Sequence, residues 1–335
     1  MIQQGRVKLG KTVNVVPLAA ESVGVRSLSV LVNTPDTGIL IDPGVALGAR
    51  GGMHPHPIEY RTLAQRLAAI QSAAQEAEII VISHYHFDHL VPFFENYAFF
   101  WSSRKHASAL YGRRRIWCKD IHSRINRSQR KRGIAFVQAA RKVAREVVFA
   151  DNHAFKIGET EVQFSPAVPH GELGTFLGSV VMTAIQYQGV SVVHASDVQG
   201  PMVSETTNWI LQQKPQLLIL AGPPTYLSPE RVSAQLITKA ANNLQRLVTQ
   251  IPIVIIDHHL QRDPCWREWL TPIQEVSRAV GHRLITVADA MGLPEQLLET
   301  RRPDLYTAEP TSPAYDAWVR TITRGLTTIP PPLEK

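Results

Sequence analysis

The sequence predicts one α/β domain spanning residues 1–335, with a basic and partly helical insertion at residues 101–150. Three observations lead to this prediction. Short apolar runs of strand length alternate with helical patterns, no low-complexity linker divides the chain, and the positive charge is concentrated in one segment. An apolar fraction of 44% and a charged fraction of 19% are ordinary for a globular protein.

The first part of the chain alternates strands with one helix. Strands are expected at residues 13–18, 28–34, 38–44 and 78–83. A helix with one apolar face is expected over about 57–77. The last of these strands, EIIVIS, is apolar at nearly every position, which predicts a strand buried on both faces.

The second part of the chain repeats this alternation. The run KRGIAFVQAARKVAREVVFA predicts a helix within residues 131–150. Strands are expected at residues 153–166, 180–187, 191–197, 215–222, 251–257 and 282–289. A further helix is expected from Ser228, as N-cap, and Pro229, as first helical residue, to residue 248. The tail around Pro330–Pro332 is expected to be a surface extension.

Charge and cysteine content restrict the classes of function. The segment 101–150 holds fourteen Lys and Arg against two acidic residues, a net charge of +12, whereas the rest of the chain carries −5. Such a block attracts anionic ligands or polyanions. Two cysteines without a CxxC pattern exclude a cysteine zinc knuckle and a disulfide scaffold, and suit a reducing cytoplasm. No leader peptide is visible, and the apolar runs are too short for a membrane helix, so a cytoplasmic protein without a membrane partner is expected.

The stretch VISHYHFDHL, residues 81–90, places four ligand-type side chains directly behind a buried strand. Imidazole nitrogens and a carboxylate oxygen suit first-row metals. His84, His86, Asp88 and His89 exceed the roughly three protein ligands of a single open catalytic metal. Two more histidines and a bridging carboxylate elsewhere in the chain would complete a site for two metals.

The pattern H-x-H-x-D-H at residues 84–89 resembles the second motif of the metallo-β-lactamase superfamily. Other stretches resemble its remaining motifs in the same order: ILIDPG with Asp42, SPAVPHG with His170, VVHASDVQG with Asp197, and IVIIDHHLQRD with His258 or His259. The phrases INRSQRKRG, GPPTYL and IIDHHLQRD are similar to the UPF0282 family within this superfamily.

The resemblance implies an αββα sandwich, in which two mixed sheets lie face to face between layers of helices. It also implies a ligand set: His84, His86 and His170 for one metal, Asp88, His89 and His258 for the other, and Asp197 as bridge, with Asp42 supporting the metal loop through hydrogen bonds. His259 stays an alternative to His258. The superfamily's RNA-processing nucleases have an arginine four positions after this histidine, and Arg262 stands four positions after His258.

A hydrolase is the function that this reading favours. The cofactors would be two divalent metal ions, with Zn preferred and Mn or Fe left open. A hydroxide bridging them would attack the substrate, with Asp88 and Asp197 as the catalytic ligands.

A phosphodiester or another anionic substrate, nucleic acid included, is favoured by the charge of segment 101–150. The candidate binding residues are Arg130, Lys131, Arg132 and His194, or Arg113–Arg115, with Tyr111 and Trp117 to stack on bases. Two alternatives stay open: a thioester or lactone hydrolase of the glyoxalase II or lactonase kind, and a nucleic-acid-binding protein with a structural metal. The basic face would also suit a homo-oligomer contact.

Overall fold

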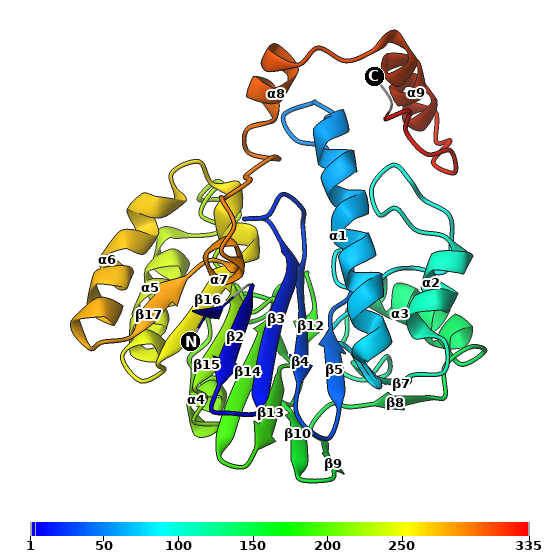
Figure 1. Cartoon of the computed structure of the whole chain (residues 1–335). Coiled ribbons are helices and arrows are strands. Elements are labelled where there is room, and N and C mark those ends of the chain that lie inside the picture. Colours follow the sequence, from blue (N-terminus) through cyan, green and yellow to red (C-terminus); the bar gives the residue numbers. More distant parts are fainter. Residues whose placement is uncertain (1, 4, 334–335) are drawn as a thin grey trace.

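The computed structural model of the chain describes residues 2–3 and 5–333. Its elements form four layers, with two mixed β-sheets packed between two layers of helices (Figure 1). The helices of the first layer are α1 (Pro57–Glu76), α2 (Arg104–Tyr111) and α3 (Arg127–Ala140), and those of the second are α4 (Ser204–Gln212), α5 (Ala234–Val248) and α6 (Trp266–Ala279). The expected αββα sandwich is confirmed.

The first sheet contains eight strands in sequence order. They are β1 (Ile2–Gln3), β2 (Arg6–Leu9), β3 (Val13–Ala20), β4 (Leu28–Asn33), β5 (Gly38–Ile41), β6 (Ile79–Ile82), β7 (Arg115–Cys118) and β8 (Glu146–Phe149). Neighbours are antiparallel from β1 to β5 and parallel from β5 to β8. The basic segment 101–150 therefore contributes two strands to this sheet, in addition to α2 and α3.

The second sheet has seven strands in the order β17-β16-β15-β14-β13-β10-β9. They are β9 (Ala154–Ile157), β10 (Thr160–Phe164), β13 (Thr183–Tyr187), β14 (Val190–Ser196), β15 (Leu217–Ala221), β16 (Ile253–Asp257) and β17 (Arg283–Ile285). The strands from β14 to β17 are parallel, and the others are antiparallel. A small separate ribbon joins β11 (Val168–Pro169) to β12 (Ser179–Val180).

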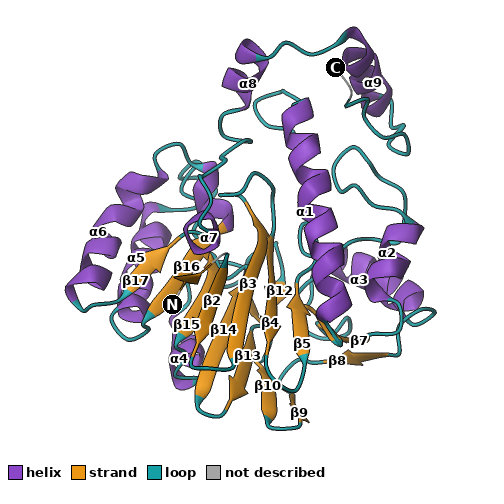
Figure 2. Ribbon diagram, viewed as in Figure 1, coloured by secondary structure: helices purple, strands orange, loops and turns teal. Residues whose placement is uncertain are grey.

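The central strands are buried on both faces, as their apolar sequences predict. In β6, Ile79 and Val81 point into the core between the two sheets, while Ile80 and Ile82 pack in the core beneath the first helical layer. Strand β15 follows the same alternation between the inter-sheet core and the core beneath α4–α6. Figure 2 shows the strands lying between the helices on either side. This burial holds the strand ends rigidly in place.

Two helix boundaries differ from the sequence prediction. Helix α3 begins after its N-cap Asn126 and ends at Ala140, and residues 146–149 pair with β7 as strand β8 although their sequence fits the helical pattern. Helix α5 begins after Ser233, whose hydroxyl accepts a hydrogen bond from Leu236 N, and not after Ser228. The Ser228 carbonyl instead accepts bonds from Arg231 N and Val232 N, which closes a separate turn.

Three further helices precede the tail at Pro330–Pro332, which itself has no helix or strand. Only the first half of the strand expected at 282–289 forms, as β17, and α7 (Val287–Met291) follows it behind a capping box. Helices α8 (Arg302–Ala308) and α9 (Pro313–Thr323) then lie beside α1 (Figure 1). The Trp318 ring contacts the Tyr60 ring of α1 edge-on at 5.3 Å between centroids, so α9 belongs to the first helical layer.

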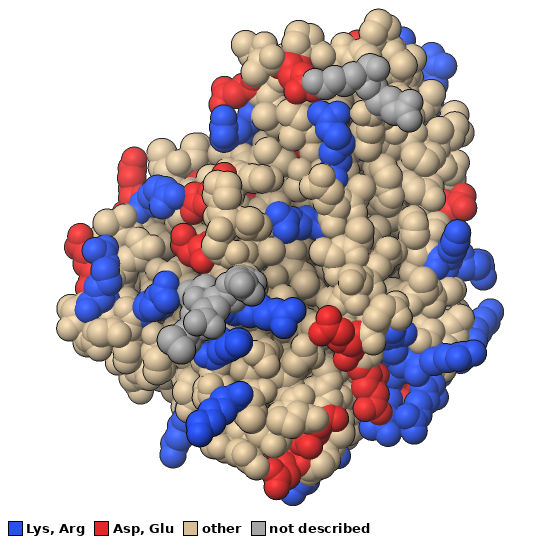
Figure 3. Space-filling model, viewed as in Figure 1, with Lys and Arg blue, Asp and Glu red and all other residues tan. Residues whose placement is uncertain are grey.

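The described helices are all too short or too polar to span a bilayer. Lys and Arg side chains gather on the flank of the molecule near α2, α3 and β8 (Figure 3). Arg141, Lys142 and Arg145 are exposed members of this flank, whereas Lys119 is buried and forms an ion pair with Asp151 at 2.6 Å.

Candidate metal centre

The candidate ligands follow the carboxyl ends of strands from both sheets. The loop 84–89 follows β6, Asp197 follows β14, and His258 and His259 follow β16. His170 follows β11 of the small ribbon. Because β5 and β6 run parallel, as do β14 to β16, these ends meet at one edge of the sandwich. Side chains more than 170 positions apart in sequence thereby converge.

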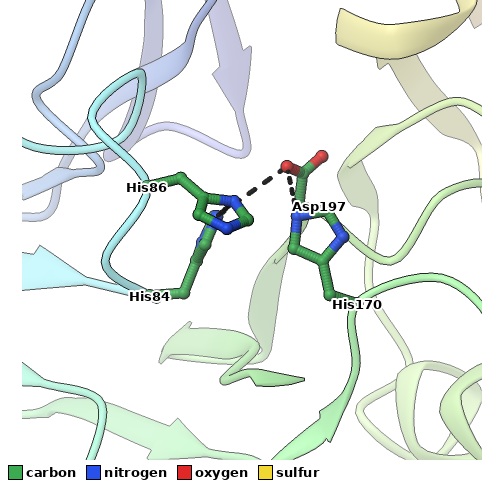
Figure 4. A group of neighbouring side chains, drawn as sticks. All are labelled: His84, His86, His170 and Asp197. Atoms are coloured by element: carbon green, nitrogen blue, oxygen red, sulfur yellow. Dashed lines mark hydrogen bonds and ion pairs between the residues drawn. The ribbon is translucent and has the colours of Figure 1, made fainter. Parts of the chain in front are cut away.

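The first group of ligand atoms comes from three histidines and Asp197 (Figure 4). His84 Nε2 lies 3.1 Å from His86 Nδ1 and 3.8 Å from Asp197 Oδ2. His170 Nε2 lies 2.9 Å from the same carboxylate oxygen. One ligand atom from each of the four residues lies within 4.8 Å of the others, a spacing that a single cation could fill.

The second group of ligand atoms approaches the same oxygen of Asp197, Oδ2. His258 Nε2 is 3.6 Å from Asp88 Oδ2 and 3.4 Å from Asp197 Oδ2. His89 Nε2 is also 3.4 Å from Asp197 Oδ2. Asp88, His89 and His258 form a cluster with the same 4.8 Å limit. Histidines of both groups therefore approach Asp197 Oδ2, as they would approach a shared ligand.

Several atoms in these groups are buried without a hydrogen bond. Among the described residues, His89 Nε2, His170 Nε2, His258 Nε2 and Asp197 Oδ1 are of this kind. An unsatisfied buried polar atom is costly, and native structures rarely leave several of them side by side. Because they point at one another, bound cations would satisfy them together. The donor set of imidazole nitrogens and carboxylate oxygens fits that role.

Asp42 supports the centre from behind. It is fully buried, and its carboxylate accepts hydrogen bonds from Ser83 N (2.8 Å), Ser83 Oγ (2.6 Å), Ser196 Oγ (3.0 Å) and His89 Nδ1 (2.9 Å). Since the Ser83 hydroxyl donates to Asp42, its oxygen is free to accept the Nδ1 proton of His84, at 2.9 Å. Each ring thereby directs its Nε2 toward the centre, where a bound cation would take the place of any proton on that atom.

His258 and His259 occupy different places at the end of β16. His258 is fully buried, and its Nδ1 donates to Glu21 Oε2 at 2.7 Å, which turns Nε2 toward Asp88 and Asp197. Arg262 in turn holds Glu21, with Nε 2.6 Å from Oε1. His259 Nε2 lies 3.2 Å from the other Asp197 oxygen, Oδ1, and its side chain is 13% exposed. The geometry thus places His258 with Asp88 and His89, while His259 forms a further group with Asp197 and His258 and is the more exposed of the two histidines.

The electrostatics of the site determine which of its ligand side chains carry a proton. Burial and the neighbouring imidazoles lower the pKa of His86 to about 3, so this ring is neutral and can donate a lone pair. Burial would raise the pKa of Asp197, but the facing His259, His258 and His170 outweigh it and hold the carboxyl well below its usual range. Burial lowers the pKa of His258, yet Glu21 and Asp197 raise it to about 9. Cation binding would therefore displace a proton from His258.

The backbone is strained at three of the strand ends that build the centre. Asp42, Ser196 and His258 have φ of 48°, 54° and 64°, in the left-handed region that non-glycine residues rarely adopt. Each marks the end of a strand, β5, β14 or β16. This sharp turning of the chain directs the side chains onto one centre, and such strain is typical of functional sites.

Some predicted substrate contacts are not placed at the centre. His194 is buried in β14, and its Nε2 donates to the Leu28 carbonyl at 2.9 Å, so the expected contact with substrate is wrong for this geometry. Tyr111 and Trp117 are buried in the two cores and cannot stack on bases. Arg113–Arg115 lie just before or at the start of β7. This is the end of the parallel strands opposite the metal loop.

The remaining basic residues, Arg130, Lys131 and Arg132, lie on α3. Arg132 faces the metal loop, with its guanidinium over the Phe87 ring at 4.9 Å from the centroid. Lys131 is exposed beside it. Arg130 is turned away, with Nη2 3.1 Å from the His122 carbonyl. The structure therefore separates the three predicted binding residues into two that face the loop region and one that does not.

The supporting residues Glu21, Ser83, Ser196 and Gln199 are absent from the sequence prediction. Gln199 Nε2 lies 3.3 Å from His170 Nδ1. Glu21 is separated from His258 by 237 positions, and no spacing links the two. The one available signal was a lone acidic residue in the largely apolar stretch LAAESVGV. Ser83 and Ser196 directly precede His84 and Asp197, so adjacency to a ligand would have found them.

The chain is similar to known proteins in sequence and in structure. A family model described as the metallo-beta-lactamase superfamily matches residues 23–91, which include the metal loop. The chain is 39% identical to a UPF0282 protein of Methanopyrus kandleri, over 87% of this chain and 98% of that one. It is also 39% identical to a UPF0282 protein of Thermococcus kodakarensis, over 88% and 96%. Among solved structures, Tm1679, a metal-dependent hydrolase of the beta-lactamase superfamily, aligns with a TM-score of 0.48 at 12% identity, over 82% of this chain and 95% of that one.

Proposed function

The chain belongs to the UPF0282 family of the metallo-β-lactamase superfamily of metal-dependent hydrolases, and we propose that it cleaves a phosphodiester or another anionic ester with the help of two divalent metal ions. One observation carries the proposal. Among the described residues, buried histidine nitrogens that make no hydrogen bond converge on the Asp197 carboxylate.

We assign each side chain a role from its contacts. His84, His86 and His170 would hold one cation, Asp88, His89 and His258 would hold the other, and Asp197 would be a ligand common to both groups. Two cations bound in this way supply an activated water at neutral pH and stabilise negative charge on the scissile group. His259, which is partly exposed beside Asp197, would contact the substrate in this assignment, and it is the alternative to His258 as a ligand. Zn suits the histidine-rich set best, and Mn or Fe would also bind it.

The anionic nature of the substrate rests on the basic residues beside the metal loop. Arg132 is next to Phe87, which lies between the ligands His86 and Asp88. A guanidinium binds phosphate or carboxylate oxygens with two parallel hydrogen bonds. A purely structural metal site is less consistent with the geometry, because Asp88 is 18% exposed and His259 13% exposed, so that the centre opens to solvent.

The test is hydrolysis by protein that has been stripped with a chelator and reloaded with Zn, Mn or Fe. Bis(p-nitrophenyl) phosphate is the phosphodiester probe, and an acyl thioester is the competing one. We expect phosphodiester turnover that depends on metal and falls roughly 100-fold or more in Asp88→Asn, because a ligand is lost. Asp304→Asn, at an exposed acid on α8, is the matched control and should retain wild-type turnover.

Two results would contradict parts of the proposal. Rapid thioester cleavage without phosphodiester turnover under any metal would exclude the phosphodiester class and favour the thioester or lactone hydrolases. No turnover of either probe by protein that binds two metal equivalents would contradict the hydrolase assignment for these substrate classes.

A further inference from the structure

A pocket of about 580 Å³ lies directly beside the metal loop. One wall is the loop itself, with Phe87 and the aromatic rings that follow it, Phe93 and Phe94. The opposite wall is α3, which contributes Ala135 and Phe136. The volume is within the range of ligand-binding pockets. Because Phe87 separates the ligands His86 and Asp88 in sequence, this pocket and the metal centre share a segment of chain.

Cations line the otherwise apolar pocket. Its lining includes Arg104, Lys131 and Arg132. None of the described residues that line it is acidic. The Arg132 guanidinium is placed over the Phe87 ring, and its Nη1 lies 3.5 Å from the Tyr85 carbonyl, a long contact that leaves its other donors for a ligand. Arg130 is not part of the lining.

We propose that this pocket binds the aryl or alkyl group of an anionic ester substrate, whose charge is held by Arg132 and Lys131. The inference rests on the proposed hydrolase function and narrows its substrate class. Aromatic walls favour an apolar group, because its burial removes apolar surface from water. The cations favour a substrate that carries negative charge next to that group. A substrate seated in this way would reach the metal centre along the loop 84–89.

Binding can be tested without any catalysis. The probe is 1-anilinonaphthalene-8-sulfonate, an aromatic anion, titrated by fluorescence into protein kept metal-free by a chelator. Ala135→Trp fills the pocket from an exposed position on α3, and Ile134→Trp places the same ring on the adjacent exposed position outside the pocket. We expect the Kd to rise about tenfold or more in Ala135→Trp, and to change by less than about twofold in Ile134→Trp.

The charge requirement has its own matched pair. Arg132→Gln removes a lining cation, whereas Arg130→Gln removes a cation two positions away on the same helix that does not line the pocket. We expect a Kd increase of about tenfold in Arg132→Gln only. An unchanged Kd in both Ala135→Trp and Arg132→Gln would overturn the proposal. The proposal would also be overturned if Arg130→Gln and Arg132→Gln raised the Kd of a single-stranded oligonucleotide equally and left the Kd of the dye unchanged. That result would identify a nucleic-acid-binding surface.

A kinetic comparison separates this inference from the proposed function. With metal-loaded protein, kcat/KM for bis(p-nitrophenyl) phosphate should exceed that for methyl p-nitrophenyl phosphate, and Ala135→Trp should remove the difference. An absence of turnover, together with dye binding that Ala135→Trp weakens, would contradict the hydrolase function and still support the pocket as an apolar-anion site. Turnover that is indifferent to the second aromatic group and to Ala135→Trp would overturn the pocket assignment and leave the hydrolase function standing.

Discussion

Three histidines of the centre are each held through the ring nitrogen that faces away from it. His84 Nδ1 bonds to the Ser83 hydroxyl, His89 Nδ1 to the Asp42 carboxylate and His258 Nδ1 to the Glu21 carboxylate. Such partners fix the tautomer and orientation of a ligand, and a carboxylate partner also makes the ring a stronger donor. Two of the three partners are carboxylates. Both of them bond to histidines of the second group, His89 and His258.

Glu21→Gln should weaken the second metal selectively. The amide keeps the size of the side chain but lacks the negative charge that makes His258 a stronger ligand, so we expect the affinity of this metal to fall about 10- to 100-fold. Titration of the metal-free protein with Zn by calorimetry should then resolve one site of wild-type affinity and one weakened site.

The control for this change is Glu299→Gln, at another largely buried glutamate, whose ion-pair partners are Arg26 and Arg50 and not a candidate ligand. It should leave both Zn affinities within a few-fold of wild type. If Glu21→Gln weakened both sites equally, the Glu21 carboxylate would serve the fold rather than His258, and the selective role would be refuted.

Residues of the centre differ in how far the sequence predicts them. His84, His86, Asp88 and His89 are recognisable because a single loop carries them at close spacing. Asp197 and His258 become recognisable only through the order of motifs along the chain. Glu21 has neither signal, because its contact with His258 depends on how the two sheets pack. Local spacing therefore predicts ligands, whereas the partners that orient them depend on tertiary structure.

The first turn of α3 links two loops of the metal centre. Gln129 is fully buried at this turn, where its Oε1 accepts from Tyr85 N at 3.3 Å and its Nε2 donates to the Leu177 carbonyl at 2.6 Å. Asn126 Nδ2 donates to the Phe176 carbonyl at 2.7 Å. The helix thus ties the loop of His84 and His86 to the loop 171–178 that follows His170.

Gln129→Ala should release the loop 171–178. The loop is otherwise weakly packed, since Leu173 is 82% and Phe176 98% exposed. The variant loses the hydrogen bond to the Leu177 carbonyl, whereas the bond from Asn126 to the Phe176 carbonyl stays. This loss should lower the free energy of local opening by about 1 kcal/mol, and amide hydrogen exchange in this segment should accelerate accordingly. Mass spectrometry of exchanged peptides measures this, with Gln138→Ala at an exposed position of α3 as the control. Wild-type exchange in Gln129→Ala would show that the link does not restrain the loop.

Helices and strands are predicted best where a single sequence pattern determines their type. The apolar runs of β6, β15 and β16 predict strands buried on both faces, and the structure has them there. Boundaries fail where two local signals compete. Ser228-Pro229 and Ser233 are both reasonable starts for α5, and a turn at the first leaves the second as the N-cap. Likewise, the sequence of β8 continues a helical pattern until its pairing with β7 is known.

The two halves of the molecule have a similar arrangement of strands, although their sequences show no repeat. In each sheet an antiparallel part precedes parallel strands, from β5 onward in the first and from β14 onward in the second. The ligand side chains follow the parallel strands or the small ribbon and come from both halves. Residues 84–89 belong to the first, and His170, Asp197 and His258 to the second. Neither half can hold both cations alone.

Metal binding should consequently stabilise the whole fold and not one loop. A ligand that binds only the folded chain adds about 2.7 kcal/mol to the free energy of unfolding at a hundred times its Kd. Because the ligands span both halves, unfolding should stay cooperative while its urea midpoint rises with Zn and falls with a chelator. Asp197→Asn should remove most of this Zn-dependent shift, since its carboxylate faces both groups, whereas Asp304→Asn should keep it. A midpoint that does not respond to Zn in the wild-type protein would mean that the convergent ligand atoms do not hold metal in the folded chain.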